Sequence, residues 1–220
     1  MKNKEFLQKQ VEAKHYDFKK YVYKGRWNSF YHQIDEILSI TSPSAYAMSI
    51  LEIGVGSGIL RAIFKFFLRI NYESIDIDEE LQPDHVGSVL EMPFADKQYD
   101  VVVCFQVLEH LPYEKFVEAL SELFRVAKKS VIISLPNAEK VYQLNIPKIC
   151  RRKLIKRPFA KIKEHKFGGE HYWEINKKGY EIKKIMETIA ETGKYFNYKL
   201  EKNYRIWEEP YHHFFVLKRQ

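Results

Sequence analysis

Residues 48–60, MSILEIGVGSGIL, constrain the fold of this chain more than any other stretch. The apolar run over 50–53 is typical of a buried strand. Three closely spaced glycines follow it, Gly54, Gly56 and Gly58, and then an apolar stretch compatible with a helix. A strand, a glycine turn and a helix in this order present backbone N–H groups to a ligand. Because glycine has no Cβ, it permits a tight turn and lets a ligand approach the backbone closely.

The spacing of these glycines helps to define the ligand. A dinucleotide-binding loop has the pattern G-x-G-x-x-G, whereas this chain has G-x-G-x-G. Asp76 ends the next predicted strand and matches the acidic residue that accepts hydrogen bonds from ribose hydroxyls. Asp78 is expected to cap the helix that follows. A plain structural turn remains the alternative interpretation of the glycines.

Predicted strands alternate with predicted helices along the rest of the chain, which implies a parallel sheet with right-handed crossovers. The last predicted elements are a helix and two strands that form a hairpin. The elements predicted after the glycine loop are strands at 72–77, 100–105 and 130–136, a helix at 113–127, a helix at 177–192 with Asn176 as its cap and Gly193 at its end, and strands at 195–206 and 212–218.

The motifs ILEIGVGSG, ESIDID, LEMPFADKQYDVVVCFQVLEHL and IISLPN occur in an order and spacing that resemble the class I S-adenosylmethionine-dependent methyltransferases. The likeness covers roughly residues 45–137 and is closest to the branch that acts on small molecules, quinones and sugars. It implies an α/β fold with a Rossmann-like, seven-stranded, mostly parallel sheet. An antiparallel C-terminal hairpin would close this sheet, helices would cover both faces, and S-adenosyl-L-methionine would be the cofactor.

The resemblance also implies roles for individual residues. Asp76 would hold the ribose, the 87–89 loop would line the adenine, and Arg26 would hold the methionine carboxylate. Many relatives have Asp where this chain has Ser88, whose hydroxyl can still accept a hydrogen bond. The implied cofactor-binding residues are Arg26, Glu52, Gly54, Gly56, Gly58, Asp76, Ile77, Ser88, Val89, Phe105 and Gln106.

We expect a single domain over residues 1–220, with 45–137 as its cofactor-binding core. Residues 1–40 are predicted to form a helical lid, although simple packing of their aromatic side chains is the alternative. Residues 138–173 form a basic insertion or cap, and 174–220 supply the closing helix and hairpin.

The basic insertion has an unusual composition. Residues 146–167 carry nine Lys or Arg and one Glu, in a chain of net charge +7. Their apolar residues recur close to helical spacing, so an amphipathic segment is expected to contact an anionic membrane surface or a phosphate-bearing substrate. A solvated cap is the alternative, and nucleic acid is a less favoured partner. The chain lacks a signal peptide and a membrane-spanning run, so we expect a cytoplasmic protein with peripheral membrane attachment.

A hydroxyl acceptor must lose a proton during methyl transfer, and histidine is well suited to accept it near neutral pH. His110, just after a predicted strand, and His171, among aromatic residues, are the candidate bases. Glu109 is a candidate to orient either of them. The sequence contains no Cys/His cluster typical of a metal site, so no metal is expected.

The leading hypothesis is therefore methyl transfer to a small-molecule, lipid-linked or sugar-linked acceptor, with a hydroxyl as the acceptor group. One alternative is an RNA methyltransferase that binds phosphates through the basic insertion. Another is a non-catalytic module that binds S-adenosylmethionine.

Overall fold

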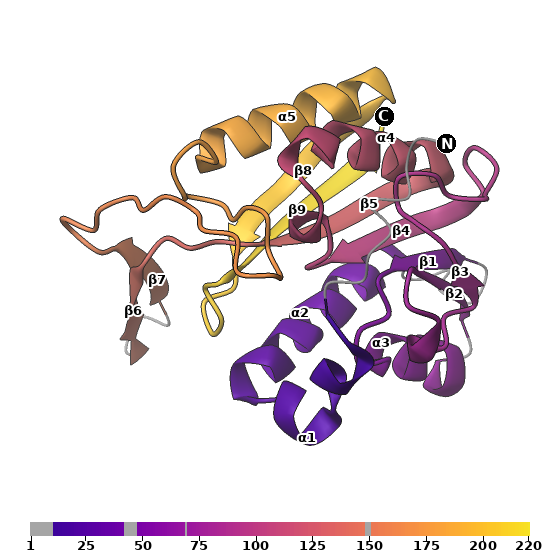
Figure 1. Ribbon diagram of the computed structural model, residues 1–220, viewed down its shortest axis with the longest axis horizontal. Helices are drawn as coiled ribbons and strands as arrows, with labels where there is room; N and C mark the ends of the chain where they lie inside the picture. The colour runs from indigo at the N-terminus through magenta and orange to yellow at the C-terminus, as the bar shows by residue number, and fades with distance from the viewer. Residues whose placement is uncertain (1–10, 42–47, 69, 148–150) are drawn as a thin grey trace.

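The computed structural model describes residues 11–41, 48–68, 70–147 and 151–220. Parts of the predicted lid (1–10) and of the basic insertion (148–150) lie outside the described residues. The main sheet has seven strands: β1 (Ser49–Ile53), β2 (Asn71–Asp76), β3 (His85–Val86), β4 (Tyr99–Phe105), β5 (Ala127–Pro136), β8 (Tyr198–Arg205) and β9 (His212–Arg219). Their order is β3-β2-β1-β4-β5-β9-β8, and only the pairings of β9 with β5 and β8 are antiparallel (Figure 1). This confirms the predicted mixed, Rossmann-like sheet.

Helices cover both faces of this sheet. They are α1 (Phe18–Tyr21), α2 (Lys24–Thr41), α3 (Ile59–Arg61), which continues as a π-helix (Ala62–Phe67), α4 (Phe116–Val126) and α5 (Ile182–Tyr195), with short 3₁₀ turns at Ala13–Tyr16, Glu79–Leu81, Leu108–His110 and Tyr113–Lys115. In Figure 1, α4 and α5 lie on one face, and α2 and α3 lie on the other. Within the described ranges, no helix combines the length and apolarity needed to cross a bilayer.

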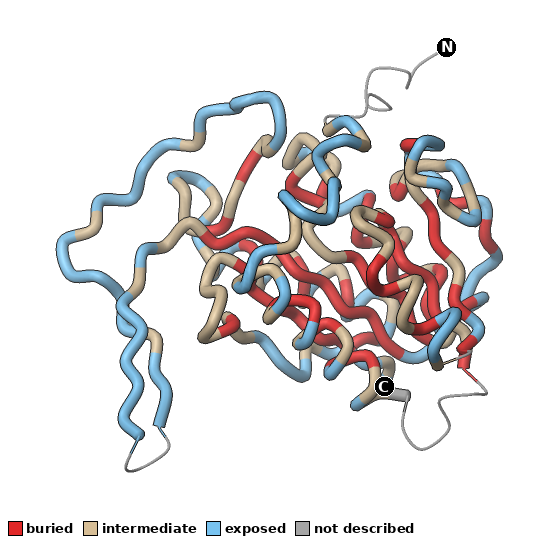
Figure 2. The backbone as a smooth tube through the Cα atoms, turned by 90° about the horizontal axis from the view of Figure 1, so that it is seen from below, coloured by how far each residue is buried: buried red, intermediate tan, exposed pale blue. Residues whose placement is uncertain are grey.

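The strands are apolar on both sides because each side packs against helices. In β4, Val102 and Cys104 belong to the core under α4 and α5, whereas Val101 and Val103 belong to the core under α2 and α3. Cys104 is fully buried. Figure 2 shows the buried strands as a continuous layer through the body of the protein.

The helix predicted at 177–192 begins later than expected, at Ile182. Asn176 and Gly179 have φ angles of 64° and 87°, which helical residues do not adopt. Asn176 still contributes to the helix start, because its Oδ1 accepts a hydrogen bond from the Ile182 N–H at 3.1 Å.

The helical character predicted for the basic insertion is wrong. The described part forms an antiparallel pair, β6 (Val141–Ile146) and β7 (Arg151–Lys156), followed by a long exposed segment. Apolar side chains alternate at Tyr142, Leu144 and Ile146, which is the two-residue period of a strand. The pair projects from the body of the protein in Figures 1 and 2.

Candidate active site

The glycine loop after β1 depends on Gly54, which has a φ angle of 82°. Its N–H donates to the Ile75 carbonyl oxygen at 2.9 Å, which joins the loop to β2. A Cβ at this position would lie 2.5 Å from Cγ2 of Val107. Both the backbone conformation and the contact therefore require glycine. The loop lies at the carboxyl ends of the parallel strands, where open α/β sheets bind ligands.

Asp76, at the end of β2, connects the two sides of this loop region. Its Oδ2 accepts a hydrogen bond from the Val55 N–H at 2.8 Å, and its Oδ1 accepts one from the Asp78 N–H at 2.9 Å. Burial raises the pKa of Asp76, whereas these backbone hydrogen bonds oppose the rise. Each carboxylate oxygen has a second lone pair with which it can accept a ligand hydroxyl. Asp78 caps the next short helix as predicted, by accepting from the Glu80 N–H.

A pocket opens between the glycine loop, Asp76 and the end of β4. Most of the predicted cofactor residues line it: Gly54, Gly56, Asp76, Ile77, Ser88, Val89, Phe105 and Gln106. The candidate base His110 lines it as well. The structure therefore brings together residues that the sequence places in four separate segments.

Three predicted cofactor residues do not line this pocket. The Arg26 guanidinium lies 4.5 Å from the centre of the Tyr21 ring, and Tyr21 itself lines the pocket. Glu52 is buried inside the sheet, and burial raises its pKa to about 8, so the neutral acid predominates at pH 7. Gly58 lines a shallow depression on the outer side of the loop. The cofactor roles of these three residues remain predictions.

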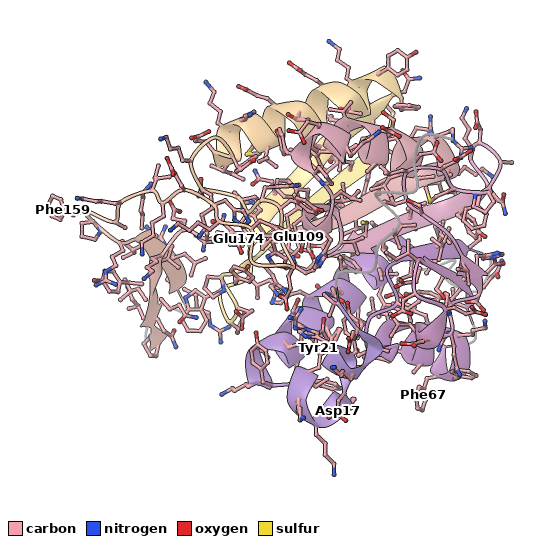
Figure 3. The ribbon with its side chains drawn as sticks, viewed as in Figure 1. Asp17, Tyr21, Phe67, Glu109, Phe159 and Glu174 are labelled. Atoms are coloured by element: carbon pink, nitrogen blue, oxygen red, sulfur yellow. The ribbon has the colours of Figure 1, made fainter. Side chains whose placement is uncertain are left out.

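The N-terminal segment contributes residues that the sequence analysis did not assign to the site. Val11, Tyr16 and Tyr21 line the pocket, and the Tyr16 ring lies over Gly56. Figure 3 shows Tyr21 among the N-terminal helices. The sequence shows that this segment is rich in aromatic residues. That composition does not distinguish side chains that line a pocket from side chains that only pack against the domain.

Glu109, His110 and His171 form a cluster next to the pocket. Each offers one potential metal ligand atom, and these atoms all lie within 4.8 Å of one another. Hydrogen bonds attach the segment that carries His171 to the turn after β4. The Tyr172 N–H donates to the Glu109 carbonyl oxygen at 2.8 Å, and the Trp173 indole N–H donates to the Leu111 carbonyl oxygen at 3.1 Å. The sequence analysis expected no metal because it found no Cys/His cluster, and it did not consider these three residues as a set of potential ligands.

Hydrogen bonds orient both histidines through Nδ1. His110 Nδ1 lies 2.9 Å from the Glu170 carbonyl oxygen, which can only accept, so Nδ1 carries the proton and Nε2 keeps its lone pair. His171 Nδ1 lies 3.1 Å from Glu174 Oε1, which also accepts from the Tyr211 hydroxyl at 2.7 Å. Figure 3 shows Glu109 and Glu174 close together at the centre of the molecule.

The surroundings shift the pKa values of these groups in different directions. Burial, followed by the nearby His171, lowers the pKa of His110 to about 4. Burial would lower the pKa of His171 too, but the carboxylates of Glu174, Glu109 and Glu170 together outweigh it and raise that pKa. Burial opposes ionisation of Glu174, yet the hydrogen bonds from His171 and Tyr211 lower its pKa to about 2. His171 is therefore the stronger base of the two histidines.

Glu109 is fully buried, and neither of its carboxylate oxygens has a hydrogen-bond partner among the described residues. Burial raises the pKa of Glu109 to about 7, although His171 and Arg26 favour the charged form. Buried carboxylates are ordinarily paired. The Glu109 carboxyl therefore has no hydrogen-bond donor among the described residues, although it lies beside two histidines with which it could share a proton or a cation.

Comparisons with known proteins agree with the geometry of the pocket. A family profile described as a methyltransferase domain matches residues 51–135. No curated protein sequence matches the chain.

Several solved structures share the fold. A protein from Pyrococcus horikoshii superposes with a TM-score of 0.58 at 12% identity, covering 96% of this chain and 100% of that chain. Magnesium protoporphyrin IX methyltransferase from Synechocystis, with bound S-adenosylhomocysteine, superposes with a TM-score of 0.56 at 14% identity. The match covers 97% of this chain and 90% of that chain. The small RNA methyltransferase HEN1 superposes with a TM-score of 0.57 at 16% identity. The match covers 86% of this chain and 25% of the HEN1 chain.

The glycine loop and the acid at the end of β2 lie within the part of the chain that matches the methyltransferase domain, residues 51–135. The chain therefore carries a methyltransferase domain and shares the fold of S-adenosylmethionine-dependent methyltransferases.

Proposed function

We propose that this methyltransferase acts on a hydroxyl group of a small-molecule, lipid-linked or sugar-linked acceptor. The observation that carries the proposal is the cluster of Glu109, His110 and His171 beside the pocket. A hydroxyl is a poor nucleophile until its proton is removed, and this cluster supplies groups suited to that task.

The residues of the pocket fit S-adenosylmethionine. Asp76 has free acceptor capacity for ribose hydroxyls, and Ser88 with Val89 would border the adenine. Gly54 and Gly56 line the pocket without side chains, which would leave room beside the loop for the methionine part. When bound, the cofactor supplies an electrophilic methyl group. The side chains of the protein then have to position the acceptor, exclude water and remove the acceptor proton.

A lipid-linked acceptor gains support from the exposed face of the β6–β7 pair. Residues paired across antiparallel strands point to the same side, so Tyr142 with Ile155, Leu144 with Lys153 and Ile146 with Arg151 share one face. The four apolar side chains of this face are between 37% and 53% exposed. The opposite face is occupied, because Arg152 contacts Glu208 and Lys156 contacts Glu139. An exposed apolar stripe flanked by cations suits the surface of an anionic bilayer.

RNA is the second candidate acceptor. The basic insertion and the fold shared with a small RNA methyltransferase favour it. An RNA acceptor predicts binding that weakens steeply as salt increases, since phosphate contacts release counterions. A non-catalytic binding module would show neither turnover nor a methylated product.

The test is to incubate the protein with methyl-labelled S-adenosylmethionine and separate lipid, water-soluble and RNA fractions from cells of the source organism. We expect label in the lipid or water-soluble fraction, attached through oxygen and absent with Asp76→Ala. Label only in RNA would favour the second candidate, and label in no fraction would contradict the proposal.

A further inference from the structure

We propose that Glu109, His110 and His171 bind one divalent transition-metal ion beside the cofactor pocket. The three side chains come from two segments, the turn after β4 and the loop before α5. A hydrogen bond from His110 to the Glu170 carbonyl oxygen joins these segments across 60 positions of the sequence. Hydrogen bonds from Tyr172 and Trp173 attach one segment to the other. The cluster is therefore built into the fold.

The distances suit a metal ion after a small closure of the side chains. The three ligand atoms lie within 4.8 Å of one another. Bonds of roughly 2.0–2.2 Å from nitrogen and oxygen to a metal place the ligand atoms about 3–4 Å apart. The ring centres of His110 and His171 are 5.0 Å apart with a 77° angle between their planes, so the two imidazoles are direct neighbours.

The unpartnered carboxylate of Glu109 is the independent sign of a missing cation. It is fully buried, and both of its oxygens lack hydrogen-bond donors within the described part of the chain. Burying a carboxylate without a partner costs free energy, and a bound metal ion would remove that cost.

The partners of the histidines match the usual surroundings of a metal site. Histidine ligands commonly donate their other ring N–H to a carbonyl or carboxylate oxygen, which fixes the tautomer. His110 Nδ1 meets the Glu170 carbonyl oxygen, and His171 Nδ1 meets the Glu174 carboxylate, itself held by Tyr211. Both Nε2 atoms are left to bind a metal ion.

Two imidazoles and a carboxylate favour zinc, manganese, iron or cobalt over magnesium or calcium, which prefer sites made of oxygen ligands. Three protein ligands leave coordination positions for water or for an acceptor oxygen. His110 also lines the pocket, so these positions would adjoin the site of methyl transfer.

The role of this ion rests on the proposed function. A cation lowers the pKa of a coordinated hydroxyl. The O–H bond would break, the proton would pass to water, and the oxygen would keep the electron pair that forms the new bond to the methyl carbon. The carbon–sulfur bond of the methyl donor would break at the same time, with its electron pair left on the sulfur of S-adenosylhomocysteine. Proton removal would then depend on the whole cluster, in place of the single histidine base expected from the sequence.

The binding test uses the full-length protein freed of metal with EDTA. Cobalt(II) should bind with one ion per chain and produce visible absorption bands, and zinc should compete with it. His110→Ala and His171→Ala should each abolish the bands. Glu174→Gln, which leaves the three ligands in place and alters the support of His171, should weaken binding about 10–100-fold. His32→Ala is the matched control, because His32 also pairs with a glutamate, Glu208, outside the cluster.

Binding of S-adenosylhomocysteine by every variant checks that it is folded. Absence of cobalt binding by the parent protein, or unchanged binding by both His→Ala variants, would overturn the metal site. Methyl transfer that continues undiminished in EDTA would overturn its catalytic use. One bound ion without any methylated acceptor would uphold the metal site and count against the proposed function alone.

Discussion

Asp76 Oδ2 accepts a hydrogen bond from the Val55 N–H at 2.8 Å, so the acid that ends β2 holds the glycine loop that follows β1. The contact makes two motifs, 21 positions apart in the sequence, one structural unit. Cofactor affinity and the conformation of the loop should therefore change together when Asp76 is replaced.

Replacing Asp76 by Ala should weaken S-adenosylhomocysteine binding by about 1.5–3 kcal/mol, the scale of a hydrogen bond to a charged group. Titration calorimetry measures the change. Asp100→Ala is the matched control, because Asp100 also accepts a backbone N–H, from Ser49 at 3.1 Å, but at the opposite ends of the strands. Equal losses of affinity in both variants would indicate general destabilisation and remove Asp76 from the site.

The predicted lid can be tested at Arg26. If Arg26 holds the methionine carboxylate, Arg26→Ala should weaken S-adenosylhomocysteine binding by about 1.5–3 kcal/mol. It should leave methylthioadenosine affinity unchanged, because that ligand lacks the carboxylate. Asp76→Ala should weaken both ligands, since both contain the ribose. A uniform effect of Arg26→Ala on the two ligands would show that Arg26 only packs against Tyr21.

Stability should fall in mild acid because His212 is buried beside Ser29, with 2.5 Å between Nδ1 and Oγ. Burial lowers the pKa of His212 to about 3, so the unfolded chain takes up a proton below pH 6.5 that the folded chain does not. The free energy of unfolding should therefore drop by about 2 kcal/mol between pH 7 and pH 5 from this residue alone.

Urea unfolding at the two pH values measures this contribution. The free energy of unfolding of His212→Gln should fall less between pH 7 and pH 5 than that of the parent protein. His15 is exposed, so His15→Gln should behave like the parent. The same loss in all three proteins would mean that other groups cause the acid sensitivity.

The β6–β7 pair offers a matched test of membrane contact. Replacing Arg151 and Lys153 by Gln removes two cations from the face that carries the apolar stripe. Binding to anionic vesicles should weaken by about 2 kcal/mol, at about 1 kcal/mol per cation. Replacing Arg152 and Lys156 removes the same charge from the opposite face, where both are paired with glutamates.

Vesicle sedimentation compares the two double variants with the parent protein. We expect the second double variant to bind nearly as well as the parent. Equal weakening of both would show attraction by net charge without a preferred face, and absence of binding by the parent would leave the pair without a membrane role.

Much of the fold could be predicted because its signals are local. Glycine spacing, apolar runs and the position of Asp76 predicted β1, β2 and the pocket between them. The basic insertion misled the prediction, because its apolar residues are compatible with more than one period. Only the pairing of β6 with β7 shows which side chains share a face.

Glu109, His110 and His171 were predicted as candidates, but their meeting in one cluster could not be predicted. Glu109 and His110 are neighbours in the sequence, whereas His171 comes close to them only because the segment carrying Tyr172 and Trp173 docks on the turn after β4. The missing partners of the Glu109 carboxylate are likewise a property of packing, which residue types alone do not reveal.

A crystal structure of the protein grown with S-adenosylhomocysteine would test most directly whether this pocket holds the methyl donor. We expect the ribose hydroxyls on Asp76, the adenine beside Ser88 and Val89, and the sulfur end directed toward His110. Binding of the ligand elsewhere, or a pocket that takes up NAD and excludes S-adenosylhomocysteine, would contradict this assignment of the pocket.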